Sequence, residues 1–178
     1  MTIVITKPDF LVAEALRIVE LLGRADVDLV HIRKPGSTVD ELERLLQELP
    51  SAVYGRLVLH DHFELAVKYG LHGVHLNSRN PEPPQGWHGS VSRSCHSIQE
   101  LAGCRGEGLD YMSLSPVFDS ISKQGYRSAF SRDEILAAHR DGIIDSRVLA
   151  LGGVTFSRIP EVLEMGFGGA MILGDAWK

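Results

Sequence analysis

The residue with the clearest chemical potential in this chain is His96, in the segment Ser-Arg-Ser-Cys-His-Ser at 92–97. It lies between a short apolar stretch and an expected helix start. An imidazole can take up and return a proton near neutral pH, which suits it to general acid–base catalysis. From its residue type and position, His96 could therefore be a catalytic acid or base, or a ligand. The alternative is a loop histidine that only hydrogen-bonds a carbonyl.

Other candidate residues follow short apolar runs elsewhere in the chain. Cations, hydroxyls and glycines predominate among them, a composition that suits a phosphorylated anion. Backbone amides of the glycine-bearing turns could hold phosphate, although these glycines could also be simple turn residues, and 117–126 could be a solvated surface loop. The predicted binding residues are His31, Arg33, Lys34, His60, Ser94, Ser120, Ser122 and Lys123, with Gly152, Gly153, Leu173 and Gly174 for phosphate.

A metal site is a further alternative for the histidines. His31, His60, His75 and His96 could bind an ion such as zinc if they converge, since neutral imidazole is a common zinc ligand. Their spacing favours this only in that they would share one end of the fold. Because His75 lies inside an apolar run, we predict that it is a buried structural residue. The two cysteines are too close in sequence, and wrongly spaced, for a disulfide framework or a zinc site, so we expect reduced thiols.

These residues need elements to position them. Short apolar segments rich in β-branched residues recur along the chain with helical patterns between them, which favours βα units over hairpins. The expected strands are 2–5, 27–32, 56–60, 73–76, 90–92, 111–114, 148–151 and 169–172.

The expected helices have visible start signals. Residues 11–22 place Leu11, Ala15, Val19 and Leu22 near one face at helical spacing. A hydroxyl followed three residues later by a carboxylate predicts a capping box, in which the two side chains satisfy free amides at the helix start. This spacing occurs in the pairs Thr38 and Glu41, Ser97 and Glu100, and Ser131 and Glu134.

Eight βα units favour closure into a (β/α)8 TIM barrel, with the candidate residues gathered at the carboxyl ends of the strands. An open doubly wound sheet is the competitor, but its usual glycine-rich first turn is replaced by Lys-Pro-Asp-Phe at 7–10. Barrels usually need at least roughly 200 residues, so we expect the last helix to be truncated or missing. Apolar surface left bare beside the first and eighth strands would then be covered in a homodimer.

Length and composition narrow the classes of protein. A chain of 178 residues predicts a single domain over 1–178. The net charge of −5, with both signs interspersed, indicates neither nucleic acid nor an anionic membrane as a partner. The apolar runs are far shorter than the roughly 20 residues of a membrane span, and the start of the chain lacks signal-peptide features, so we expect a cytoplasmic protein.

Taken in order, several short motifs resemble the thiamine phosphate synthase and TenI superfamily over almost the whole chain. They are His-Ile-Arg at 31–33, His-Asp at 60–61, Gly-Val-His-Leu at 73–76, Ser-Cys-His-Ser at 94–97, Asp-Tyr with Pro-Val-Phe at 110–118, Ser-Ile-Ser-Lys at 120–123 and Ala-Leu-Gly-Gly-Val at 150–154.

The resemblance implies one of two reactions. Synthases of this superfamily join hydroxymethylpyrimidine diphosphate to a thiazole phosphate with Mg2+, and Asp61 matches one of their magnesium carboxylates. The second carboxylate is replaced by Asn80, so metal-assisted ionisation of the diphosphate looks impaired. The TenI branch, which resembles this chain in Arg-Ser-x-His-Ser at 93–97, contains thiazole tautomerases that require no cofactor.

The sequence thus favours a TenI-like tautomerase that binds a small phosphorylated thiazole. In this interpretation His96 moves the proton, Arg33 and Lys123 bind the substrate carboxylate, Ser120 and Ser122 line the pocket, and the glycine-bearing turns take the phosphate. A synthase using Mg2+ and a protein that binds thiamine phosphate without turnover are the alternatives.

Overall fold

The computed structural model describes residues 1–119 and 128–178. Its eight strands form a closed parallel barrel in chain order, which confirms the predicted (β/α)8 fold. Four expected strands have the predicted bounds; the second, third and seventh are shorter than expected, and the fifth extends to Cys95. The strands are β1 (Thr2–Ile5), β2 (Leu29–Ile32), β3 (Leu57–Leu59), β4 (Gly73–Leu76), β5 (Ser90–Cys95), β6 (Tyr111–Leu114), β7 (Val148–Ala150) and β8 (Gly169–Ile172).

The chain is divided into two compact units. The N-terminal unit comprises Ile3–Val91, and the C-terminal unit comprises Ser92–Lys178 together with Met1 and Thr2. The predicted single domain over 1–178 stays a prediction. Each unit is described by itself below.

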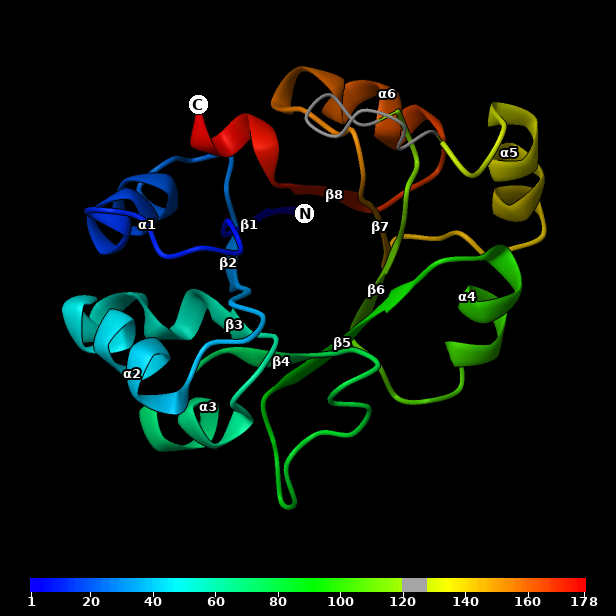
Figure 1. Ribbon diagram of the computed structural model, residues 1–178. Helices are drawn as coiled ribbons and strands as arrows, with labels where there is room; N and C mark the ends of the chain where they lie inside the picture. The colour runs from blue at the N-terminus through cyan, green and yellow to red at the C-terminus, as the bar shows by residue number, and fades with distance from the viewer. Residues whose placement is uncertain (120–127) are drawn as a thin grey trace. The chain divides into compact units, whose positions relative to one another are not determined.

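In the N-terminal unit, the strands pair in parallel with a register that aligns Val4 with Val30, Val30 with Leu57, and Val58 with Gly73. Its helices lie on one side of these strands in Figure 1. Fully buried aliphatic side chains such as Ile18, Leu42 and Leu46 pack from the helices. The helices are α1 (Glu14–Leu22), α2 (Val39–Glu48) and α3 (Phe63–Tyr69), with a 3-10 helix η1 (Ser51–Arg56) before β3.

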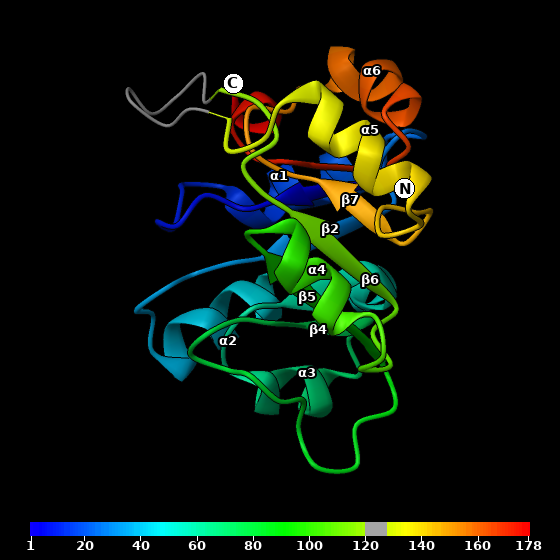
Figure 2. The same cartoon turned by 90° about the vertical axis from the view of Figure 1, so that its right-hand side faces the viewer.

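In the C-terminal unit, β5 to β8 pair in the same way, with Leu114 aligned to Ala150 and Ala150 to Ala170. Figure 2 looks onto α4 and α5, which lie in front of these strands. The core includes the fully buried Leu101, Met112 and Ile172. The helices are α4 (Ile98–Cys104), α5 (Arg132–Arg140) and α6 (Ile159–Glu164), with 3-10 helices η2 (Phe156–Arg158) and η3 (Gly174–Trp177).

The first helix begins later than the sequence predicts. α1 starts at Glu14 because Ala13 adopts a left-handed conformation with φ of 57°. The Glu14 carboxylate accepts a hydrogen bond from the Leu11 amide at 3.2 Å, which fixes this turn. The predicted face is also partly wrong, since Leu11 is exposed and Ile18 takes the buried position expected for Val19.

Two of the three predicted capping boxes are complete, at α2 and α5. At α4, Ser97 caps the helix by accepting from the Glu100 amide at 3.0 Å. The Glu100 carboxylate, however, accepts from the amide of His96 at 2.7 Å instead of that of Ser97. The cap therefore also holds the backbone of the predicted catalytic histidine.

The βα repeat is less regular than expected. Residues 77–89, which are all described, contain no helix between β4 and β5. After β8 the chain forms only the 3-10 helix η3, as the expected reduction of the last helix predicts. Cys95 and Cys104 are free and buried, which confirms the expected thiols. None of the helices in the described parts of the chain is long and apolar enough to cross a membrane.

Candidate functional site

Arg33 follows β2 directly and its backbone is fixed from β1. The Arg33 amide donates to Thr6 Oγ1 at 2.9 Å, and the Thr6 hydroxyl donates back to the Arg33 carbonyl at 3.3 Å. Among residues 1–119 and 128–178, no carboxylate forms an ion pair with the Arg33 guanidinium. A guanidinium held by its backbone and not neutralised by a neighbour can receive an anion.

Lys34, in contrast, directs its charge inward. Its Nζ donates to the Glu14 carboxylate at 2.6 and 2.8 Å and to the carbonyls of Lys7 and Asp9 at 2.9 and 2.8 Å. An ammonium has three hydrogens to donate, so these acceptors satisfy it. Its predicted contact with substrate stays a prediction, and the arrangement gives it a structural role that anchors the segment after β1.

Three histidines meet on one face of the strands in the N-terminal unit. His31 Nδ1 lies 2.9 Å from His60 Nε2, and the His60 and His75 rings stack with centroids 4.2 Å apart. One nitrogen of each imidazole falls within 4.8 Å of the others. The exposed fractions of His31, His60 and His75 are 0%, 5% and 1%. We call these residues the three-histidine cluster.

Burial keeps the cluster neutral. Desolvation lowers the pKa of His31 and of His60 well below the ordinary histidine value, and the neighbouring His75 adds to both effects. Burial and the charge of Arg33 lower the pKa of His75 to about 3. At neutral pH each ring therefore has one N–H donor and one nitrogen lone pair.

Asp61, the predicted magnesium ligand, is already neutralised. Arg79 donates to both of its carboxylate oxygens at 3.0 to 3.2 Å, and Asn80 Nδ2 donates to Oδ1 at 3.0 Å. Mg2+ prefers several hard, anionic oxygen ligands. Here one carboxylate faces an arginine and an amide donor, so these residues do not fit a Mg2+ ion.

His96 is exposed at the end of β5, in the C-terminal unit. Its Nδ1 lies 3.2 Å from Ser115 Oγ, which follows β6. When Nδ1–H donates to this hydroxyl, Nε2 carries the lone pair that a general base needs. Ser94 lies in β5, two residues before His96. Its hydroxyl oxygen accepts a hydrogen bond from the buried Ser113 hydroxyl at 3.3 Å.

Packing explains why glycines follow β7, whether or not their amides also bind a ligand. Gly152 and Gly153 have φ of 92° and 64°, and a Cβ on either would lie 2.8 Å from the side-chain Cβ of Pro116 or Phe118 respectively. Only glycine fits such an approach at positive φ. Pro116 and Phe118, which follow β6, thereby lie against the turn after β7.

The turns after β7 and β8 are joined to each other. Asp175 in η3 accepts from the Phe156 amide at 3.1 Å and from the Lys178 ammonium at 2.6 Å. Across residues 1–119 and 128–178, no protein group accepts from the amides of Gly152, Gly153, Leu173 or Gly174. Such amides can donate to an anionic oxygen.

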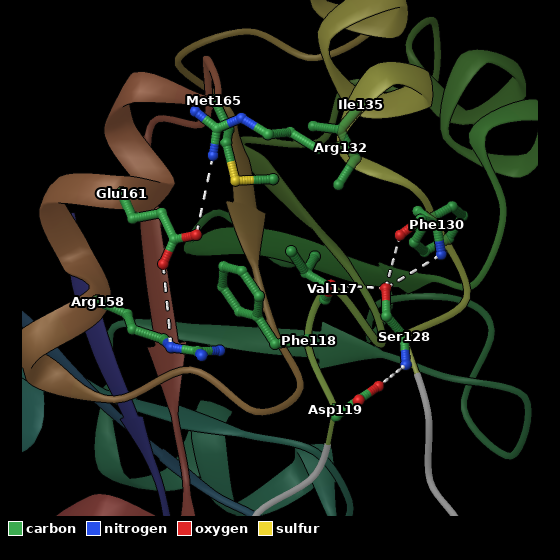
Figure 3. A pocket seen from close by; sticks show the side chains of 10 residues that line it. All are labelled: Val117, Phe118, Asp119, Ser128, Phe130, Arg132, Ile135, Arg158, Glu161 and Met165. Carbon is green, nitrogen blue, oxygen red and sulfur yellow. Dashed lines mark hydrogen bonds and ion pairs between the residues drawn. The ribbon is translucent and has the colours of Figure 1, made fainter.

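A pocket of about 520 Å³ lies elsewhere in the C-terminal unit, between the loop after β6 and helices α5 and α6 (Figure 3). Glu161 lies between Arg132 and Arg158, at 3.8 and 3.9 Å, and the Arg158 guanidinium lies over the Phe118 ring. Of the predicted site residues within 1–119 and 128–178, none lines this pocket.

Sequence reasoning missed three partners of the predicted residues. Thr6 and Ser115 each come directly after a strand, so the strand-end rule that selected the other candidates could have found them. No sequence pattern around Arg79 indicates that it pairs with Asp61. Ser120, Ser122 and Lys123 lie outside the described residues.

The fold defines the chain as an α/β-barrel protein. A family profile described as thiamine monophosphate synthase matches residues 2–174, and the chain belongs to this family of thiamine biosynthesis.

Individual relatives agree with that assignment. A crystal structure of thiamine phosphate pyrophosphorylase from Bacteroides thetaiotaomicron is 39% identical with a TM-score of 0.87, over 99% of this chain and 84% of that one. A putative thiamine-phosphate synthase from Geobacter sulfurreducens is 28% identical over 90% of this chain and 78% of its own length. The thiamine-phosphate synthase of Photorhabdus laumondii is 26% identical over 94% and 81%.

Proposed function

We propose that this protein is a TenI-like thiazole tautomerase that needs no magnesium. The observation that carries the proposal is the state of Asp61, which pairs with Arg79 and accepts from Asn80. A diphosphate leaving group requires a cation to neutralise it, and this carboxylate offers Mg2+ neither a free charge nor a second anionic partner. Isomerisation of a thiazole carboxylate phosphate has no such requirement.

In the proposed reaction, a base removes a proton from a ring carbon and returns one to the exocyclic carbon. The substrate thus gains aromaticity with no net change in protons. His96 suits both steps because it is exposed and its Nδ1 is held by Ser115. The neutral Ser115 hydroxyl can accept from the ring before or after proton transfer.

Substrate binding in this proposal depends on positive charge and backbone amides. Arg33, with Lys123 as a second cation, would bind the substrate carboxylate, and Ser94, Ser120 and Ser122 would contact the ligand. The amides of Gly152, Gly153, Leu173 and Gly174 would take the phosphate. The absence of protein acceptors for these amides within residues 1–119 and 128–178 supports this role.

Thiamine phosphate synthase is the second candidate, and the names of the relatives favour it. In that case Asp61 would have to leave Arg79 and, with the substrate phosphates, hold Mg2+. Binding of thiamine phosphate without turnover is the third candidate.

The deciding experiment supplies the purified protein separately with the thiazole tautomer and with the two synthase substrates plus Mg2+. The tautomerase proposal expects aromatisation that is unaffected by chelator and is lost in His96→Asn. The exposed His88 provides the matched control, His88→Asn, which should retain full activity.

Formation of thiamine phosphate at a rate abolished by Asp61→Ala would overturn the proposal in favour of the synthase. Undiminished aromatisation in His96→Asn would remove the proposed base. If neither reaction occurs but thiamine phosphate raises the Tm, the binding candidate stands, because a ligand that prefers the native state stabilises it.

We also propose that the protein forms a homodimer. Phe10, Leu11, Val12 and Leu16, around the start of α1, are exposed apolar side chains that favour association. Light scattering coupled to size exclusion should give twice the chain mass, and a monomer at micromolar concentration would contradict it.

A further inference from the structure

The three-histidine cluster moves no proton in the proposed reaction, and contact of His31 and His60 with substrate stays a prediction. Its geometry, however, is that of a metal-ligand set. The strand register explains why the three rings meet. His31 aligns with Val58, and Leu59 aligns with Val74, so His60 falls beside His75 and on the same face as His31. Side chains two residues apart on a strand share a face, which makes the convergence a property of the sheet.

We propose that His31, His60 and His75 bind one divalent transition-metal ion of the zinc type. Three imidazoles with one position left open form a ligand set found in catalytic zinc sites. Nitrogen ligands favour Zn2+, Co2+, Ni2+ or Cu2+ over Mg2+, so this site is distinct in chemistry from the carboxylate at Asp61.

The distances need only a small adjustment. Four-coordinate zinc holds imidazole nitrogens at about 2.1 Å, which separates two such nitrogens by roughly 3.4 Å. His31 Nδ1 and His60 Nε2 are 2.9 Å apart, and all three candidate nitrogens lie within 4.8 Å of one another. Rotations of the rings that open the short contact and draw in His75 would bring the three into that range.

Protons can also be accounted for. In the ion-free state one of the two facing nitrogens of His31 and His60 carries the hydrogen they share. When a metal binds, that hydrogen moves to the other nitrogen of the same ring, so both lone pairs face the ion and no net proton is released. Burial of the neutral rings favours this state.

Charge determines what fills the open position. Three neutral ligands leave the ion with its full positive charge, and Arg33 lies close enough to affect His60 and His75 electrostatically. A buried dication beside an arginine requires an anion.

The test uses untagged, chelator-treated full-length protein titrated with Co2+. We expect one equivalent to bind with the intense visible d–d absorption of four-coordinate Co2+. Zn2+ should displace it and Mg2+ should not. Exchangeable, paramagnetically shifted imidazole N–H signals should report three histidine ligands.

Variants identify the ligands. His75→Gln should weaken Co2+ binding by roughly a hundredfold or more, whereas His88→Gln, at an exposed histidine of the same unit, should bind like the wild type. His31→Gln is the second ligand variant, for use if His75→Gln does not fold.

Absence of the four-coordinate Co2+ spectrum in the wild type would overturn the proposal whatever the variants do. So would a spectrum that persists in folded His75→Gln. The proposed tautomerase function is independent of this site, since its assay includes a chelator.

Discussion

Lys34 Nζ lies 2.6 Å from Glu14 Oε1, with 0% and 2% of the two side chains exposed. Removing one partner of such a pair leaves an uncompensated buried charge. We therefore expect Glu14→Gln to lower the free energy of unfolding by about 3–5 kcal/mol, measured by urea denaturation.

The exposed pair of Arg17 and Glu20 on the same helix provides the control. Glu20→Gln should change stability by less than about 1 kcal/mol. Equal effects of the two substitutions would show that the buried pair contributes no more than a surface one.

The three-histidine cluster should make the metal-free protein sensitive to acid. Its pKa values are lowered on folding, so the unfolded chain binds more protons as the pH falls below about 6.5. Stability should therefore be full above this value and decrease below it. Each histidine contributes about 2 kcal/mol of loss by pH 5.

Urea denaturation in the presence of chelator between pH 7 and 5 measures this slope. His75→Gln should reduce the slope by about a third, since one of three similar contributions is removed. A slope unchanged in that variant would mean that the cluster does not control acid stability.

Asn80→Asp should create a magnesium site at Asp61. The side-chain Nδ2 of Asn80 lies 3.0 Å from Asp61 Oδ1. A carboxylate at this position would therefore give Mg2+ a second anionic ligand. Combined with Arg79→Ala, we expect Mg2+ binding at least about tenfold tighter than in the wild type, measured by calorimetry.

Arg79→Ala with Asn80→Ala is the matched control, because it removes the same side chains without adding a carboxylate. Tight Mg2+ binding by the unmodified protein would contradict our interpretation of Asp61.

Gly153→Ala should destabilise the C-terminal unit. Gly153 has φ of 64°, and an added Cβ would lie 2.8 Å from the Phe118 Cβ. The left-handed conformation and the close contact together should cost about 2–4 kcal/mol. Differential scanning calorimetry would measure the fall in Tm.

Gly55→Ala is the control for this substitution, since nothing lies within 4 Å of its Cβ position and its φ is not positive. It should leave Tm nearly unchanged. A similar response at both glycines would argue against strain at the turn after β7.

Several features of the fold could be predicted because they depend on residues close in sequence. The apolar β-branched segments placed all eight strands, and the pairs Thr38 and Glu41, and Ser131 and Glu134, correctly marked helix starts. The start of α1 could not be predicted, since Glu14 is held by Lys34, which lies 20 residues away.

The sequence by itself determined the alternation of strands and helices, the family and the residues that follow each strand, because local patterns and motif order carry that information. Only the tertiary structure decided which of those residues are neutralised. Lys34 is satisfied by Glu14, Asp61 by Arg79, and His31 faces His60. These partners lie 18 to 29 residues apart in the chain, and strand register and burial bring them into contact, so no local pattern indicates which side chains remain available to a ligand.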